Sequence, residues 1–306
     1  MLTRDIPEFL KVARSLPADL GPAVARGAFL VSPDGMWLND ESAGDNAYMD
    51  LARRIDPDRA LAQHRGLHAA LSRLLPTVAF AGDPATPDAV FPNNVFATAH
   101  VGGQGRYLVA RMCHPIRQRE ADRADISGFF ERVLGYARFD LREKAGVGEL
   151  TGSMVIDRAR GIGFCGLSRR CDEAGAAAMH AAFGLRATLM FDLAPSEYHT
   201  NVVLTLMAGR AALLAPDGFA DPAVVEAVAS LYRHAVRLSP EEKAAYAGNA
   251  ITLSGDTVWM SGTAGAALSE ATRQGLAAAG FALATVDLDE LEKAGGSLRC
   301  CVGEIF

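Results

Sequence analysis

The chain has 306 residues, a formal net charge of −6, 50% hydrophobic residues and 22% charged residues. This composition is typical of a compact globular enzyme and excludes a disordered or fibrous protein. The acidic balance lacks the basic surface that nucleic-acid binding requires, so no nucleic-acid partner is expected. The length allows two ordinary domains or one large α/β domain.

The first residues do not predict a secretory signal. Charged side chains at Arg4, Asp5, Glu8 and Lys11 interrupt the segment, and it has no unbroken apolar core. No stretch approaches the roughly 18 uninterrupted apolar residues of a membrane-spanning helix. We therefore expect no membrane partner.

The five cysteines are an odd number and show no C-x-x-C spacing; they are Cys113, Cys165, Cys171, Cys300 and Cys301. This usage indicates a reduced, cytoplasmic protein with no zinc site of cysteines. Cys300 and Cys301 are adjacent, and consecutive cysteines are poorly placed to form a disulfide with each other. Three interpretations of the pair remain at this point, namely buried packing thiols, metal ligands or a nucleophile.

The predicted elements repeat in one order along the chain: two short apolar runs joined by a turn, a helix, and a further short run. In the third unit, "TGSMVID" and "GIGFCGL" precede the helix "DEAGAAAMHAAFG" and the strand "ATLMFDL". The other units contain, in chain order, "GAFLVS", "ALAQHRGLHAALSRLL" and "TVAFAG"; "NNVFATAHV", "RYLVARM", "ADRADISGFFERVLG" and "YARFDLR"; "TNVVLTLM", "RAALLAP" and a helix over 221–237; and "NAITLS", "TVWMS", "SEATRQGLAAAG" and "FALATVDL".

About five ββαβ units result, and the first lacks one strand, which the C-terminal "CCVGEIF" could supply. We therefore predict an α/β fold with one domain over residues 1–306. In this prediction the units form a five-bladed ββαβ propeller with pseudo-five-fold symmetry and a central active site, and the terminal cysteines lie on the closing strand. The alternative is an ordinary two-layer α/β domain.

Polar residues interrupt four strand-like segments at or near their starts. They are Asn93 and Asn94 in "FPNNVF", Glu149 in "GELTGSM", His199 and Asn201 in "SEYHTNVVL", and Cys300 in "GGSLRCC". A cysteine, a histidine and a carboxylate are the parts of a thiol-based covalent mechanism. Each also has a plainer interpretation, because the histidine could be structural, the glutamate solvated and the asparagines part of a turn.

These motifs, together with "GFCGLSRRCDEAGA" and in this order, resemble the guanidino-group-modifying enzymes, the pentein or amidinotransferase superfamily. The similarity is greatest to its citrulline hydrolases and arginine-deiminase-related proteins. The resemblance implies a five-bladed ββαβ propeller and a cysteine-dependent hydrolase without metal or organic cofactor. It implies that Cys300 is the nucleophile with Cys301 packed behind it, that His199 and Asn201 form the family's H-x-D/N motif, and that Glu149 is the catalytic carboxylate. Leu150 stands where many members have glycine.

The resemblance also implies how the substrate is held. Arg170 matches a position that holds a substrate carboxylate, and Arg117 and Arg299 are further candidates. Asn94 stands where arginine deiminases and dimethylargininases have an aspartate facing the guanidinium. An amide can donate to a urea oxygen, so Asn94 favours citrulline hydrolysis, or arginine hydrolysis through citrulline to ornithine, with release of ammonia.

The expected partner is thus a small guanidino or ureido amino acid, and the resemblance is compatible with a homo-oligomer. The alternatives are an amidinotransferase, a dimethylargininase, or a non-catalytic binding module with the same fold.

Overall fold

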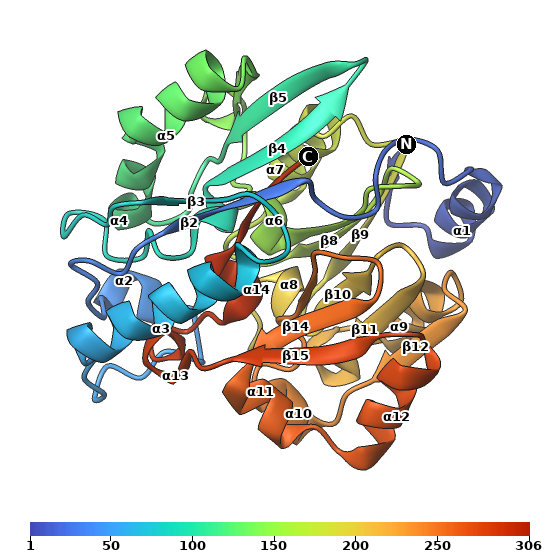
Figure 1. The fold of residues 1–306 in the computed structure, drawn as a ribbon. Coiled ribbons are helices and arrows are strands. Elements are labelled where there is room, and N and C mark those ends of the chain that lie inside the picture. The colour runs from blue at the N-terminus through green and yellow to red at the C-terminus, as the bar shows by residue number, and fades with distance from the viewer.

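The computed structural model describes residues 1–306, and it contains five small sheets with helices around them (Figure 1). The strands are β1 (Leu2–Thr3), β2 (Gly27–Val31), β3 (Thr77–Phe80), β4 (Phe96–Val101), β5 (Gln104–Val109), β6 (Ala137–Asp140), β7 (Met154–Asp157), β8 (Ile162–Leu167), β9 (Ala187–Asp192), β10 (Leu204–Met207), β11 (Ala211–Leu214), β12 (His234–Arg237), β13 (Ile251–Thr252), β14 (Thr257–Ser261), β15 (Ala282–Val286) and β16 (Gly303–Ile305).

The sheets share one topology. Their strand orders are β16-β2-β3, β4-β5-β6, β7-β8-β9 with β1 added beside β9, β10-β11-β12 and β13-β14-β15. In each sheet the first pair is antiparallel and the second is parallel. Parallel neighbours need a long crossover, and a helix supplies it in every unit. This is the α/β element order predicted from the sequence, and β16 from the C-terminus pairs with β2.

The helices are α1 (Ile6–Ser15), α2 (Asp40–Ala43), α3 (Pro57–Leu71), α4 (Pro115–Gln118), α5 (Ala124–Gly128), α6 (Leu150–Ser153), α7 (Glu173–Ala182), α8 (Thr200–Val203), α9 (Pro222–Ala229), α10 (Pro240–Ala244), α11 (Gly262–Ala267), α12 (Glu270–Ala278), α13 (Asp289–Glu292) and α14 (Leu298–Cys301). Shorter or wider turns are η1 (Pro92–Asn94), η2 (Arg119–Asp122), η3 (Phe129–Val133), η4 (Leu141–Glu143) and η5 (Pro216–Gly218). No helix has both the length and the apolar character needed to cross a membrane.

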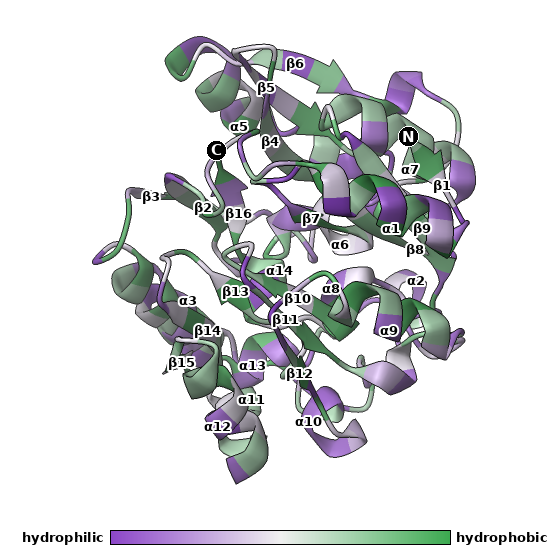
Figure 2. Ribbon diagram, turned by 90° about the vertical axis from the view of Figure 1, so that its right-hand side faces the viewer, coloured by the Kyte–Doolittle hydropathy of each residue, from purple (hydrophilic) through white to green (hydrophobic).

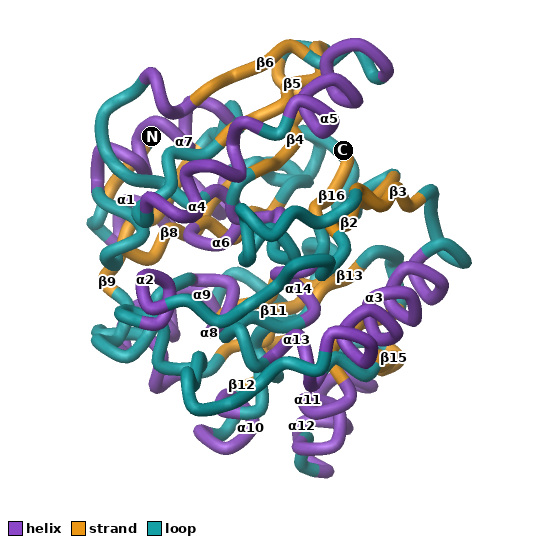
Figure 3. The backbone as a smooth tube through the Cα atoms, turned by 90° about the vertical axis from the view of Figure 1, so that its left-hand side faces the viewer, coloured by secondary structure: helices purple, strands orange, loops and turns teal.

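The longer helices lie outside the strands and cover them. Helix α3 packs on β3 and also contacts β15 of another sheet (Figure 3). In Figure 2 the strands near the middle are largely hydrophobic, whereas the outer helices carry hydrophilic stretches beside hydrophobic ones. This division is the one expected of helices that bury one stripe against a sheet.

Two sequence predictions need correction. The helix expected over 221–237 ends at Ala229, and His234–Arg237 form β12, which pairs in parallel with β11. Pairing satisfies the backbone groups along the edge of β11, and this tertiary gain exceeds the helical preference of the local sequence. Cys300 and Cys301 lie on α14 and not on the closing strand, because both of their backbone N–H groups donate to the carbonyl oxygen of Ser297 (3.0 and 3.2 Å).

A short turn precedes the first strand of every sheet. These turns are η1 before β4, α6 before β7, α8 before β10, the segment around Asn249 before β13, and α14 before β16. Helices α6, α8 and α14 lie near the middle of the molecule in all three views (Figures 1–3). The polar residues singled out in the sequence are therefore brought toward one place. Strand pairing within the sheets does not by itself close them into a ring, so the five-bladed propeller stays a prediction.

Candidate active site

Cys300 is a buried thiol surrounded by amide side chains. The Asn249 amide Nδ2 lies 3.3 Å from the Cys300 Sγ, and the Asn201 Nδ2 lies 3.8 Å from it. The Cys300 backbone N–H donates to Asn249 Oδ1 at 3.3 Å. Burial raises the pKa of the Cys300 thiol above its ordinary value more than the Asn249 hydrogen bond lowers it, so the resting thiol is protonated.

Cys301 differs from its neighbour although both side chains are buried. Its sulfur has no hydrogen bond to a side chain, and it belongs to an apolar cluster with Leu298, Val302 and Phe306. Burial raises the pKa of Cys301 well above its ordinary value. The turn α14 thus presents one thiol to amide groups and packs the other into the core.

His199 and Glu149 form a second buried pair, on the turns before β10 and β7. The His199 Nε2 lies 2.8 Å from the Glu149 Oε2, and the other Glu149 oxygen accepts from the backbone N–H of Cys113 at 3.1 Å. Burial alone would raise the pKa of Glu149, but the His199 hydrogen bond and the charge of Arg170 lower it to about 2. Burial also lowers the pKa of His199. Neutral His199 therefore donates Nε2–H to an ionised Glu149, and its Nδ1 is left without a partner.

Gly152 allows the histidine to approach Asn94. A Cβ atom at Gly152 would lie 2.5 Å from the Asn94 Oδ1 and 2.8 Å from the His199 Nδ1. Both distances are shorter than side chains tolerate, so any other residue would displace one of these atoms. Leu150 in the same turn has φ = +32°, in the region that glycine prefers. The leucine thus keeps the local backbone that the resemblance associates with glycine.

A narrow cavity lies between Cys300, Asn94, Asp88, Arg117 and Arg170. The space open to the centre of a water molecule is about 10 Å³, which is room for about one water molecule. Two acceptors in its lining, Asp88 Oδ1 and Asn94 Oδ1, are buried without a hydrogen-bond donor. Unsatisfied buried acceptors are costly, and a ligand rich in N–H groups would satisfy both.

The two arginines of the cavity are engaged inside the protein. Arg117 forms a two-point ion pair with Glu120, through Nε (2.8 Å) and Nη2 (2.9 Å), and it also donates to the carbonyl groups of Asp88 and Phe91. Arg170 donates to Asp45 Oδ1 from Nε (3.1 Å) and Nη2 (2.6 Å). Both guanidinium groups are therefore held in fixed positions beside the cavity.

Residues 39–50, which we call the covering segment, close the cavity from one side. Ser42, Asn46 and Met49 contribute to its lining. Asn46 Nδ2 donates to the carbonyl of Gly295 at 3.1 Å, and the carbonyl of Ser42 accepts from Arg170 Nη2 at 2.9 Å. The covering segment contributes no β-strand, and side-chain hydrogen bonds hold much of it in place.

The structure does not bring Arg299, a predicted substrate ligand, to the lining of this cavity. Its Nη2 pairs with the Glu304 carboxylate at 2.8 Å, and its Nη1 donates to the carbonyl of Val302 at 3.0 Å. It lines a separate cavity with Thr151 and Phe306. The cause is the turn of α14, which directs residue 300 and residue 299 to different sides.

Sequence reasoning missed Asn249, Asp88 and Asp45. Asn249 interrupts "YAGNAITL" just before a strand, in the same way as the polar residues that were noticed, so the pattern could have revealed it. Asp88 sits in "TPDAVFPN", an ordinary turn composition without a distinctive signal. Asp45 approaches Arg170 across 125 residues of chain, which no local pattern encodes.

Comparison with known proteins places the chain in a family. The family model for "N,N dimethylarginine dimethylhydrolase, eukaryotic" matches residues 32–306. The chain belongs to the dimethylarginine dimethylaminohydrolase family. Within this family it is 30% identical over 264 residues to the N(G),N(G)-dimethylarginine dimethylaminohydrolase of Mycobacterium tuberculosis (strain ATCC 25618 / H37Rv), covering 85% of this chain and 80% of the relative.

Solved structures share the fold of this family member. The N-terminal domain of ArgZ, an arginine dihydrolase of cyanobacteria, superposes with a TM-score of 0.76 at 19% identity and covers 91% of this chain and 97% of that domain. AgrE in complex with ornithine and NAD+ gives a TM-score of 0.77 at 21% identity, over 92% of this chain and 39% of AgrE. A dimethylarginine dimethylaminohydrolase adduct gives 0.67 at 18% identity, over 92% of this chain and 99% of that one. These likenesses concern the fold.

Proposed function

We propose that this protein is a cysteine-dependent hydrolase that acts on the guanidino or ureido carbon of an arginine-like amino acid. The observation that carries the proposal is the cavity in which the Cys300 thiol lies among arginines and unsatisfied acceptors. Family membership supports the same reaction class. One of the solved structures similar in fold is an ArgZ variant covalently bound to a reaction intermediate.

In the proposed mechanism Cys300 attacks the central carbon of the substrate. Neutral His199 accepts the thiol proton at Nδ1, the ring atom that has no partner, and Glu149 stabilises the resulting imidazolium. His199 then donates this proton to the departing amine, which leaves a covalent intermediate on sulfur. A water molecule attacks the intermediate, His199 takes its proton, and the thiol is restored as product leaves.

Different polar groups around the thiol are proposed to bind different parts of the substrate. Asp88 and Asn94 are placed to accept hydrogen bonds from its N–H groups, and Asn201 and Asn249 hold the sulfur. Arg170 and Arg117 supply positive charge for a substrate carboxylate. To form a two-point pair with the Nε–Nη2 edge of Arg170, this carboxylate has to replace Asp45.

Two kinds of substrate are candidates for the proposed reaction. Asn94 favours a ureido group or sequential hydrolysis of arginine, because an amide donates to a urea oxygen and has no charge that selects a cation. The family's model and its mycobacterial member favour methylated arginine. Asp88 adds a carboxylate near the thiol, which suits a cationic guanidinium. Dimethylarginine hydrolysis is therefore the second candidate.

Incubation with arginine, citrulline and dimethylarginine, followed by mass spectrometry of products, tests the proposal. We expect turnover of at least one of them and release of ammonia, or of dimethylamine from dimethylarginine. The variant Asn94→Asp should suppress citrulline hydrolysis and favour arginine hydrolysis that stops after the first ammonia. No turnover of any guanidino or ureido amino acid would contradict the proposal, and an unchanged citrulline-to-arginine ratio would contradict the role of Asn94.

We further propose that residues 1–306 form one domain in which the five sheets are the blades of a closed propeller. Contacts between β16 and β4, between β7 and β10 and between β10 and β13 support this arrangement. We also propose a reducing compartment such as the cytoplasm, because the five cysteines are an odd number without C-x-x-C spacing.

A further inference from the structure

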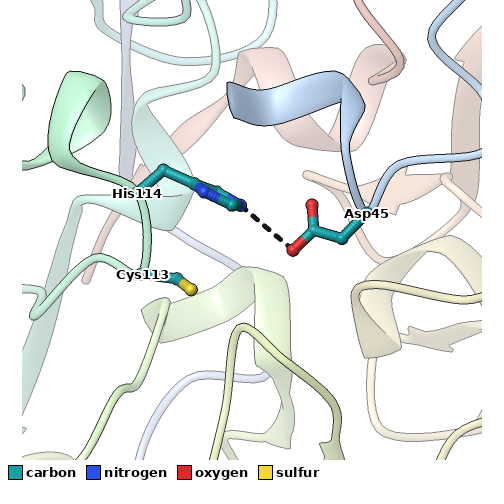
Figure 4. A group of neighbouring side chains, drawn as sticks. All are labelled: Asp45, Cys113 and His114. Carbon is teal, nitrogen blue, oxygen red and sulfur yellow. Dashed lines mark hydrogen bonds and ion pairs between the residues drawn. The ribbon is translucent and has the colours of Figure 1, made fainter. Parts of the chain in front are cut away.

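Three side chains beside Arg170 and Glu149 gather around one point, and none of them forms a bond or carries a proton in the proposed mechanism. They are Asp45 from the covering segment and Cys113 and His114 from the loop that precedes α4 (Figure 4). A carboxylate oxygen, a thiol sulfur and an imidazole nitrogen lie within 4.8 Å of one another. His114 Nε2 is 3.0 Å from Asp45 Oδ2.

We propose that Asp45, Cys113 and His114 bind a divalent transition metal ion, with zinc as the best match. Zinc takes sulfur, nitrogen and oxygen donors at about 2.0–2.3 Å, so its tetrahedral ligand atoms are separated by about 3.3–3.8 Å. The histidine–aspartate pair is already near this spacing, and the ion takes the place of the proton between them. The thiol has to approach by about 1 Å, which rotation about one or two side-chain bonds provides. Three protein ligands leave a fourth position for water.

Charged groups of both signs surround this point, and Arg170 is the nearest cation. Asp45 also accepts from Arg170 through its other oxygen, an outer contact that orients the carboxylate as such partners do in metal sites. Glu149 approaches the backbone N–H of Cys113 and adds a second negative charge nearby.

A metal ion here would control access to the site. Cys113 and His114 lie outside the covering segment, so an ion shared with Asp45 ties that segment down. It also keeps Asp45 against Arg170, the residue that the substrate carboxylate has to reach. Bound zinc should therefore slow turnover. This consequence depends on the proposed function, whereas metal binding itself does not.

Zinc binding to chelator-treated protein, measured by equilibrium dialysis, tests the site independently of activity. We expect one zinc ion per chain in the wild type and in Cys300→Ser. Cys113→Ala and His114→Ala should weaken binding by more than the roughly 10–100-fold that loss of an outer partner causes, and Cys165→Ala, which removes a buried thiol elsewhere, should not. Cobalt(II) should show thiolate charge-transfer absorption that disappears in Cys113→Ala. Absence of stoichiometric zinc, or zinc that needs Cys300 and not Cys113, would overturn the proposal.

Turnover with and without zinc tests the control of access. Zinc should inhibit the wild type and leave Cys113→Ala active, because the side chain of Cys113 takes no part in the reaction. Equal inhibition of both proteins would assign the effect to Cys300 and overturn this part. An enzyme without turnover even before zinc is added would refute the proposed function instead, and the dialysis result would still stand.

Discussion

The proposed reactive centre and the segment that covers it are held in the structure by different means. Cys300, His199 and Glu149 lie on or next to short turns that lead directly into strands β16, β10 and β7. The covering segment is held largely by hydrogen bonds from side chains such as Asn46 and Asp45. A hydrogen bond contributes about 0.5–1.5 kcal/mol net, or about 1.5–3 kcal/mol when a charge is involved. Substrate groups can replace such contacts one by one, whereas moving the centre requires disrupting the sheets.

The largest effect should come from exchanging the two adjacent thiols of the centre. Cys300→Ser should abolish turnover, because a hydroxyl is a far weaker nucleophile in the same place. Cys301→Ser should retain most activity and lose stability, because it buries a hydroxyl in an apolar cluster. Turnover rates and thermal unfolding of both variants provide the comparison. An inactive Cys301 variant beside an active Cys300 variant would show that the roles are reversed.

A smaller loss is expected from replacing His199, the proposed proton carrier. His199→Ala should lower turnover by roughly 10²–10⁴-fold, the usual contribution of general acid–base help. His180→Ala is the matched control. His180 lies in the last turn of α7, outside the site, and forms a hydrogen bond with Thr188 of β9. Steady-state kinetics on folded variants measures the difference. A loss below about tenfold at His199 would remove it from this role.

A substitution in the covering segment should change substrate binding and leave the rate of the chemical step unchanged. Asp45→Asn weakens the ion pair with Arg170, so KM should fall by about tenfold, the lower limit for a charged hydrogen bond, with kcat little changed. Asp50→Asn is the control, because the Asp50 side chain accepts a hydrogen bond only from the nearby backbone N–H of Ala52. A higher KM for Asp45→Asn would mean that Asp45 holds bound substrate instead of competing with it.

The pH dependence of kcat/KM should follow the ionisation of His199 in the centre and should not depend on the covering segment. Burial lowers the pKa of His199, and the base must be neutral to accept the thiol proton. The value of kcat/KM should therefore stay constant as pH falls to 6.5 and decline only below it, by up to tenfold per pH unit. The pH at which kcat/KM begins to decline should be the same in Asp50→Asn as in the wild type. A decline that begins above pH 6.5 would mean that His199 has a raised pKa.

The same contrast explains how far the sequence could be interpreted. Strand periodicity and turn residues predicted the order of elements, and polar interruptions before strands pointed to Glu149, His199 and Cys300 as candidates. The strand β12 was missed because it forms only by pairing with β11. Asp45 and His114 are 69 residues apart, and Arg299 turns away because of the helical geometry of α14. These features depend on tertiary contacts that local patterns do not contain.

The central claim is that a covalent intermediate forms on Cys300. The most direct test is to mix enzyme and substrate, quench with acid during turnover, and locate the added mass by peptide mass spectrometry. The account predicts an adduct equal to the substrate minus its departing amine, on Cys300 and not on Cys301, which disappears as substrate is exhausted. Turnover without any adduct on Cys300, or with the adduct on another residue, would contradict it.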